Sequence, residues 1–239
     1  MNKHLSNILN QNKKDRYMLT TKTLLKITAL ICAIALILPL TSCARKTGYE
    51  AFERTREIGE KTFRDITTES ADYETVKAVY ELELFNGDHN KMFNPQGQLT
   101  VSEAVALIVR INSIFTGKKP DYAPVYSTDP WYTGYVNQAE RRGLFPTQKT
   151  YTRFTRGIRI EDFYAFIANT LPEAEYTPVY PGKKASDIED NIYFAEINKL
   201  IESGILPYNE GDELNPRDFV TRIDAAKMIL KLIKQDSRG

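Results

Sequence analysis

Two arginines stand at the expected starts of helices, where their chemistry favours an acidic ligand. Arg222 lies in the run Thr221-Arg222-Ile223-Asp224, and Arg159 follows Ile158 in the middle of the chain. A guanidinium group can hold a carboxylate through two parallel hydrogen bonds. Helix capping needs no arginine at this position, so both residues are candidate ligand contacts. Solvated arginines at helix starts are the alternative.

The threonines and acids near these positions have a local explanation. Thr100 and Glu103 have the spacing of a capping box, in which the hydroxyl accepts from the N3 amide and the carboxylate accepts from the N-cap amide. Thr221 and Asp224 approximate the same arrangement. Such a cap stabilises a helix by about 1 kcal/mol without any ligand. These four residues therefore predict two helix starts.

Three further side chains are candidates for a binding groove. Trp131, the single tryptophan, offers a flat apolar face on which a sugar ring can pack, and a core or staple residue at a helix start is the alternative. Asp65 and Asp187 are expected to cap a turn or to accept a bond from a loop amide, with a place in a groove as the alternative.

Residues suited to catalysis or metal binding are scarce. His89 is the one histidine beyond the amino-terminal leader, and Asp88-His89-Asn90 lacks the Gly and the terminal Glu of a calcium loop. The acidic pairs Glu161-Asp162 and Glu189-Asp190 are expected on solvated faces, with hydrolase carboxylates as the alternative. We expect no enzyme, no metal site and no cofactor.

Three helix–loop–helix units position these residues. In the first and third units, a proline stands 11 positions after an aliphatic residue at the end of the first helix, and the threonine that begins the second helix stands five positions after the proline. The matched positions are Leu84, Pro95 and Thr100 in the first unit and Ile205, Pro216 and Thr221 in the third. The middle unit has a shorter loop, from Leu144 to Ile158, and lacks the Asn-Pro turn.

Apolar residues recur three or four positions apart in both helices of every unit, which predicts helices that bury one face. In the first helices these positions are Val76 and Val79, Val136 and Ala139, and Ile197 and Leu200. Gly143 and Gly204 suit a left-handed residue after a helix end. Glu83 stands at that place in the first unit, so we expect a looser helix end there.

The fold class that these patterns predict is all-α. Two short helices cannot bury their apolar faces alone, so the units 63–117, 118–172 and 173–235 must share a core. A pseudo-threefold helical bundle is the simplest arrangement, and a linear solenoid is the alternative.

The amino end predicts export. Residues 27–40 form an apolar run of 14 residues, short for a membrane span of roughly 20, and the signal occupies residues 1–42 or begins at Met18. Its ending, Leu40-Thr41-Ser42-Cys43, resembles a bacterial lipobox, which implies a lipidated Cys43 as the first mature residue. An ordinary signal peptide or an uncleaved anchor is the alternative.

Residues 43–62 read as a lipid-anchored, flexible tether, although Tyr49, Phe52 and Ile58 are compatible with a short docking helix instead. From Cys43 onward the chain has 26 basic and 30 acidic residues, a net charge of −4, and no basic run. Such a chain is a poor nucleic-acid binder.

Several motifs together resemble S-layer homology repeats. Thr221-Arg222-Ile223-Asp224 resembles the Thr-Arg-Ala-Glu signature of that family. Other parts of the repeat resemble Phe63-Arg64-Asp65-Ile66, Phe93-Asn94-Pro95, Trp131-Tyr132 and Gly143-Leu144-Phe145. The resemblance implies a pseudo-trimer whose grooves bind a secondary cell-wall polysaccharide, often a pyruvylated one. Val101 replaces the family's arginine, Ile158 its threonine and Asp224 its glutamate, so at most two of the three grooves are equipped.

The resemblance and the lipobox imply a lipoprotein on the outer face of the cytoplasmic membrane. Its repeats would bind wall polysaccharide and link the membrane to the cell wall. Degenerate repeats that act as a scaffold for an envelope protein partner, without glycan binding, are the alternative.

Overall fold

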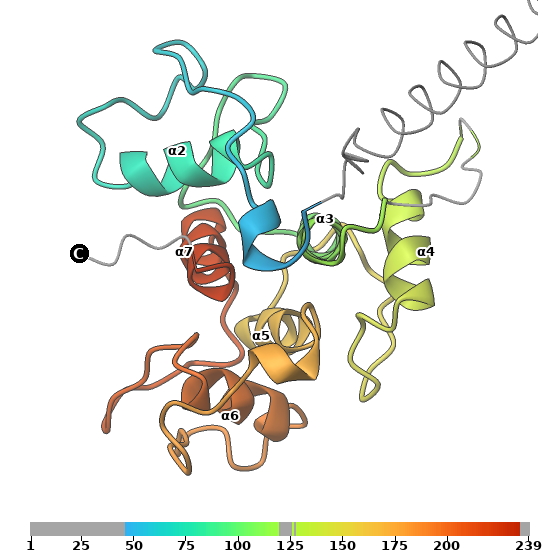
Figure 1. Cartoon of the computed structure of the whole chain (residues 1–239), viewed down its shortest axis with the longest axis vertical. Helices are drawn as coiled ribbons and strands as arrows, with labels where there is room; N and C mark the ends of the chain where they lie inside the picture. Colours follow the sequence, from blue (N-terminus) through green and yellow to red (C-terminus); the bar gives the residue numbers. More distant parts are fainter. Residues whose placement is uncertain (1–45, 120–125, 127, 235–239) are drawn as a thin grey trace, which may run out of the picture. The chain divides into compact units, whose positions relative to one another are not determined.

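The computed structural model describes residues 46–119, 126 and 128–234. Their regular elements are α-helices and two short 3₁₀ helices, with no β-sheet within those ranges, so the predicted all-α class is confirmed (Figure 1). The elements are η1 (Gly48–Ala51), α2 (Tyr73–Glu81), α3 (Val101–Thr116), α4 (Thr133–Arg141), α5 (Ile160–Ala168), η2 (Glu173–Glu175), α6 (Phe194–Glu202) and α7 (Arg222–Leu232).

The predicted signal peptide, the alternative start at Met18 and the lipidation site Cys43 lie outside the described residues. Within the described ranges, no helix combines the length and the apolar character that crossing a membrane requires.

The helices form three helix–loop–helix units, named here hairpin 1 (α2–α3), hairpin 2 (α4–α5) and hairpin 3 (α6–α7). The name refers to chain order, because the two helices of a unit make few or no contacts with each other. Within residues 45–239, which form one compact unit, α3, α5 and α7 lie at the centre and α2, α4 and α6 lie outside them (Figure 1). Each inner helix packs against the outer helix of the following hairpin, because α3 contacts α4, α5 contacts α6, and α7 contacts α2. The three hairpins therefore share one core rather than burying three separate ones.

A closed ring of backbone hydrogen bonds joins the segments that precede the inner helices. The amide of Leu99 donates to the carbonyl of Val220 (2.9 Å), that of Val220 to Ile158 (3.1 Å), and that of Ile158 back to Leu99 (2.8 Å). All three side chains are buried. A pseudo-threefold bundle would require cyclic contacts of this kind between its three units. The symmetry itself stays a prediction.

The first backbone amides of each inner helix donate hydrogen bonds to carbonyls of a neighbouring hairpin. In α3, the amides of Val101 and Ser102 donate to carbonyls in the hairpin 2 loop; those of Ile160 and Glu161 in α5 donate to the hairpin 3 loop. The first two amides of α7 donate in the same way to Gly97 and Pro95 of hairpin 1. Amides at a helix start have no partner inside the helix, so these bonds fix how the hairpins meet.

The end of α2 differs from the sequence expectation. Gly143 and Gly204 have the predicted positive φ values of +64° and +75°, and Glu83 adopts the same conformation at +58°. The amide of Leu84 still bonds to the carbonyl of Val79 at 3.0 Å, as that of Leu144 does to Ala139 at 2.9 Å. The looser end predicted for the first unit is wrong, because the packing of the fully buried Leu84 imposes the turn on a non-glycine residue.

Residues 46–58 are packed on the helices and are not a flexible coil, so that part of the tether prediction is wrong. Phe52 is buried, Tyr49 meets Phe115 edge-on at 5.3 Å, and Ile58 packs against the core. The three apolar residues that favoured docking hold this segment, with η1 as its only helical turn among the described residues. Their burial outweighs the entropy of a free chain.

Candidate functional site

The helix caps that precede the candidate arginines form as predicted. Thr100 and Glu103 make a complete capping box at the start of α3. At α7 the Thr221 hydroxyl accepts from the amide of Asp224 at 3.2 Å, but the shorter aspartate returns its bond to the hydroxyl rather than to the N-cap amide. Arg222 is therefore presented as the first residue of α7, directly after a well-formed cap.

Arg222 reaches from α7 into hairpin 1. Its guanidinium donates to Glu103 Oε1 (2.6 Å), to the carbonyl of Phe93 (2.7 Å) and to the carbonyl of Asn86 (3.0 Å). The side chain is only 11% exposed. Three of its five N–H groups thus bind protein acceptors and two remain. The sequence argument missed this structural role, because the acceptors lie more than a hundred residues away along the chain.

A groove opens beside this arginine, with a cavity volume of about 210 Å³. It is lined by residues from all three hairpins: Leu84, Phe85, Asn86, Gly87, Leu99, Glu103, Ala106, Leu107, Arg110, Trp131 and Arg222. Trp131 is 59% exposed, so the core alternative for this residue is wrong. Two residues proposed from sequence, Trp131 and Arg222, therefore line one groove although they belong to different hairpins.

Arg110 is a second cation of the groove and was not predicted. It donates to the carbonyl of Leu84 at 2.9 Å and to the Tyr135 hydroxyl at 3.2 Å. The Tyr135 ring in turn meets Trp131 edge-on. The available signal was that Arg110 is the only charged residue of α3 after Glu103, in an otherwise apolar helix.

Asp65 and Asp187 clamp the loops of hairpins 1 and 3. Asp65 accepts from the amides of Phe93 (2.8 Å) and Asn94 (2.7 Å), and Asp187 accepts from the equivalent Leu214 (2.8 Å) and Asn215 (3.3 Å). The predicted bonds to loop amides are confirmed. Neither aspartate lines the groove beside Arg222. Asp65 holds the loop whose Phe93 carbonyl accepts from Arg222, and Asp187 holds the corresponding loop of hairpin 3.

Arg159 is not the equivalent of Arg222. In the ring of backbone bonds, Ile158 matches Leu99 and Val220, so Arg159 takes the N-cap position of Thr100 and Thr221. Ile160 and Val101 then stand where hairpin 3 has its arginine. The alignment of Ile158 with the family's threonine is wrong by one residue, because the ring is set by buried aliphatic side chains rather than by the Thr-Arg pair.

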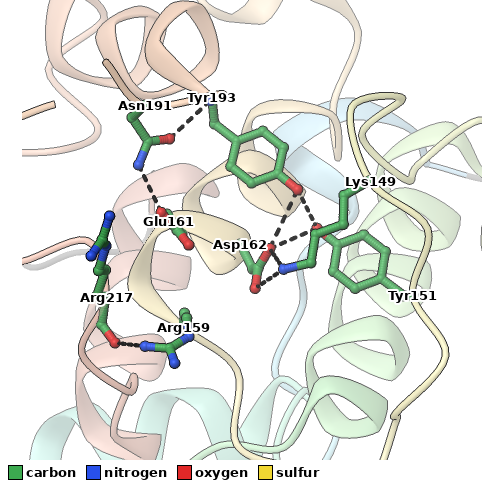
Figure 2. A network of polar contacts seen from close by, with 8 residues as sticks. All are labelled: Lys149, Tyr151, Arg159, Glu161, Asp162, Asn191, Tyr193 and Arg217. Carbon is green, nitrogen blue, oxygen red and sulfur yellow. Dashed lines mark hydrogen bonds and ion pairs between the residues drawn. The ribbon is translucent and has the colours of Figure 1, made fainter. Parts of the chain in front are cut away.

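Hairpin 2 contains a buried polar cluster where hairpin 1 has the groove (Figure 2). Asp162, the N3 residue of α5 as Glu103 is of α3, is 1% exposed and accepts from Lys149 Nζ at 2.7 and 2.8 Å. The hydroxyls of Tyr151 and Tyr193 donate to Asp162 Oδ1 at 3.0 and 3.3 Å. The expectation that Asp162 decorates a solvated face is wrong, since a lysine and two tyrosines compensate its burial.

Aromatic rings surround the polar cluster of Lys149, Tyr151, Asp162 and Tyr193, called here the Lys149 cluster. Tyr151 stacks on Phe145 at 5.6 Å and meets Phe166 edge-on at 4.8 Å. Burial, with hydrogen bonding between the two hydroxyls, raises the pKa of Tyr151 well above its ordinary value. Burial also raises the pKa of Tyr193. Both hydroxyls therefore stay protonated at neutral pH, and each has one proton to donate, either to the carboxylate or to the other hydroxyl.

The loop of Asp88, His89 and Asn90 uses its carboxylate internally. Asp88 Oδ1 accepts from the amides of Asn90 (2.8 Å) and Met92 (2.9 Å), and the bond to Met92 is the main cause that lowers the Asp88 pKa. The carboxylate stabilises a turn by these two bonds. Among residues 46–119, 126 and 128–234, no group of three or more His, Cys, Asp or Glu side chains could hold a metal ion.

Comparison with known protein families identifies two regions of the chain. The S-layer homology domain model matches residues 62–105 and 186–226. The chain contains two S-layer homology regions. The matched regions contain Asp65, the capping box of α3, Asp187 and Arg222. Hairpin 2 lies outside both regions, so a third S-layer homology repeat stays a prediction.

Curated relatives agree with this assignment. The chain is 29% identical over 182 residues to the S-layer protein sap of Bacillus anthracis and 28% identical over 182 residues to an S-layer protein of Bacillus thuringiensis subsp. finitimus; both alignments cover 73% of this chain. It is 25% identical over 148 residues, 59% of its length, to the surface-layer 125 kDa protein of Lysinibacillus sphaericus. The matches span 22%, 22% and 13% of those proteins. They support a cell-surface protein with a general role in wall anchoring.

Proposed function

We propose that this protein binds a secondary cell-wall polysaccharide through the groove lined by Trp131, Glu103 and Arg222. The observation that carries the proposal is that an exposed indole and a guanidinium with two remaining N–H groups line the same cavity. A sugar ring can pack on the indole while an acidic substituent bonds to Arg222. The bound saccharide would be an acidic one, of which a pyruvylated sugar is an example.

The size and location of the groove favour one sugar unit of a longer polymer. Its volume of about 210 Å³ lies below the roughly 300–1,000 Å³ of most small-molecule pockets. Because three hairpins contribute to its lining, binding would also hold the hairpins together. An anchoring protein gains from this coupling, since ligand binding adds stability to the folded state.

The second part of the proposal is attachment to the membrane through lipid on Cys43. Two acyl chains give stable anchoring, whereas one is marginal. Only two residues separate Cys43 from the packed segment that begins at Lys46, a reach of about 10 Å. The lipid would thus hold the body close to the outer face of the cytoplasmic membrane, and the protein would link membrane to wall. We propose no enzymatic activity.

A scaffold without glycan binding is the second candidate, and two observations favour it. Arg222 already pairs with Glu103 and two carbonyls, as an arginine that only joins two hairpins would. Val101 and Ile160 also leave the other two equivalent positions without an arginine.

Sedimentation with purified wall sacks tests the groove. The full chain, held in a nonionic detergent, should pellet with intact sacks and stay in solution after acid stripping of their secondary polymer. Trp131→Ala should reduce binding about tenfold, because it removes the surface on which the sugar ring packs. The indole is exposed, so the variant should still fold. Ile192→Ala is the matched control, since this 58% exposed residue precedes α6 as Trp131 and Tyr132 precede α4.

Equal pelleting with stripped and intact sacks, or equal losses for both variants, would support the scaffold instead. Release of reducing sugar or peptide from the sacks would indicate an enzyme. Lipid attachment is tested separately by labelling cells with an alkyne fatty acid. The wild-type protein should carry the label and Cys43→Ala should not, and label retained by Cys43→Ala would exclude that site.

A further inference from the structure

The groove beside Arg222 has one wall formed by the chain that follows α2. Residues 84–87, called here the groove wall, line the cavity and form no regular helix or strand. Arg222 binds this wall through the carbonyl of Asn86 at 3.0 Å, and its guanidinium carbon lies 5.5 Å from the centre of the Phe85 ring. The position of the Asn86 carbonyl therefore influences where the two remaining N–H groups of Arg222 point.

A second arginine, Arg56, binds the groove wall without lining the cavity. Its Nη2 donates to the carbonyl of Phe85 (2.9 Å) and to Asn86 Oδ1 (2.8 Å), and its Nε donates to the carbonyl of Tyr80 in α2 (2.6 Å). The guanidinium carbon also lies 3.6 Å from the centre of the Tyr80 ring. A guanidinium group is planar and rigid, so these contacts fix the groove wall relative to α2.

Arg56 and Arg222 bind different parts of the same residue. Arg56 binds the side-chain oxygen of Asn86, and Arg222 binds its backbone carbonyl. The Asn86 side chain is exposed, so its own packing does little to hold it. Loss of Arg56 would leave the wall free to move relative to α2. Arg56 lies outside both regions that the S-layer homology model matches, so the family comparison assigns it no role.

The segment that carries Arg56 is docked on two helices. Within residues 46–58, the amino-terminal segment, η1 packs against α3 (Figure 1). Further along, the amide of Thr55 donates to the carbonyl of Glu81 at the end of α2 (2.9 Å). The segment begins two residues after Cys43, so in a lipidated protein it would join the anchor to the groove wall.

We propose that Arg56 is a positioning residue for the groove and that the amino-terminal segment regulates ligand binding there. When the segment is docked, Arg56 holds the groove wall, and the wall orients Arg222 toward the ligand. Release of the segment frees the wall and weakens binding. Because such coupling is reciprocal, a bound polymer also favours the docked segment. This regulation rests on the proposed function, in which the groove binds wall polysaccharide.

Sedimentation with wall sacks, using the full chain in nonionic detergent, tests the positioning role. Arg56→Gln should bind intact sacks about fivefold more weakly than the wild-type protein, at the low end of typical couplings between sites. Arg54→Gln is the matched control and should keep the wild-type affinity. Arg54 belongs to the same segment but pairs with the carboxylate of Glu81 at 3.0 Å rather than with the groove wall.

Arg56→Lys separates positioning from folding. The lysine keeps the charge and an apolar stem over the Tyr80 ring, so this variant should fold even if Arg56→Gln does not. It should still bind intact sacks weakly, because an ammonium group cannot reproduce the forked contact with Tyr80, Phe85 and Asn86.

NMR of the Arg222 guanidinium tests the coupling without a ligand. Its Nη protons should exchange with solvent faster in Arg56→Gln and Arg56→Lys than in the wild-type protein, because the Asn86 carbonyl that accepts from Nη2 is less firmly held. Arg54→Gln should leave this rate unchanged. An arginine that only stabilised the amino-terminal segment would give the same result as Arg54.

Equal sack binding by Arg56→Gln and Arg54→Gln, or an unchanged Arg222 exchange rate in both Arg56 variants, would overturn the inference. Equal pelleting of the wild-type protein with intact and stripped sacks would instead overturn the proposed function. In that case the exchange rates would still decide whether Arg56 positions Arg222, so the two failures are separate results.

Discussion

Hairpins 1 and 2 differ in the surroundings of the carboxylate at the N3 position of the inner helix. In hairpin 1 the N3 carboxylate of Glu103 pairs with Arg222 from another hairpin, and a groove remains open beside Trp131. In hairpin 2 the N3 carboxylate of Asp162 pairs with Lys149 from its own loop. The tyrosine rings and hydroxyls around this pair fill the space, and Val101 replaces the arginine.

The difference shows how one scaffold separates binding from stability. A groove needs donors that are not fully used, and Arg222 retains two N–H groups. In the Lys149 cluster the Asp162 carboxylate and the two tyrosine hydroxyls are hydrogen-bonded to one another and to Lys149, so the cluster rigidifies the contact between α5 and α6. The number of similar repeats is therefore a poor guide to the number of binding sites.

The largest loss of stability is expected from breaking the ion pair between Lys149 and Asp162 in hairpin 2. Lys149→Met should lower the free energy of unfolding by about 3 kcal/mol, because it leaves the 1% exposed Asp162 carboxylate without its cation. Urea unfolding measures this change, and the exposed Lys61→Met should have little effect. Comparable small losses in both variants would show that the cluster does not stabilise the fold.

A smaller effect is expected from the arginine of the groove. Arg222→Ala should cost about 2 kcal/mol, because the carbonyls of Asn86 and Phe93 and the carboxylate of Glu103 lose a donor. Arg159→Ala is the matched comparison and should change stability by about 0.5 kcal/mol or less. If urea unfolding gave equal losses for both, the distinction drawn here between the two arginines would be wrong. Arg222→Lys should restore little, since an ammonium group cannot reproduce the three-way contact.

The smallest effect concerns alkaline pH. The folded pKa of Tyr193 is raised by burial above the ordinary value of about 10, so the folded state holds this proton more tightly than the unfolded state. The contribution of Tyr193 to stability should be constant below pH 10 and fall as the pH rises further. Urea midpoints at pH 8, 10 and 11 measure the decline. Tyr193→Phe should reduce it and Trp131→Ala should not, whereas an unchanged decline in Tyr193→Phe would exclude this hydroxyl as a source.

Much of the fold was predictable because it rests on local rules. The apolar stripes located the outer and inner helices, and the threonines located the starts of α3 and α7. The middle hairpin was misaligned by one residue, since its N-cap is an arginine. An aliphatic residue precedes each inner helix by two positions (Leu99, Ile158, Val220), and this pattern would have given the correct alignment.

The sequence by itself determined the all-α class, the helix caps, the loop clamps of Asp65 and Asp187 and the family, because each depends on spacing within about thirty residues. Only the tertiary structure decided which arginine faces a groove. Arg222 and Glu103 are 119 residues apart, and their contact exists because a ring of backbone bonds brings three loops together. It also decided that Asp162 is buried, since compensation for its charge comes from residues on two hairpins.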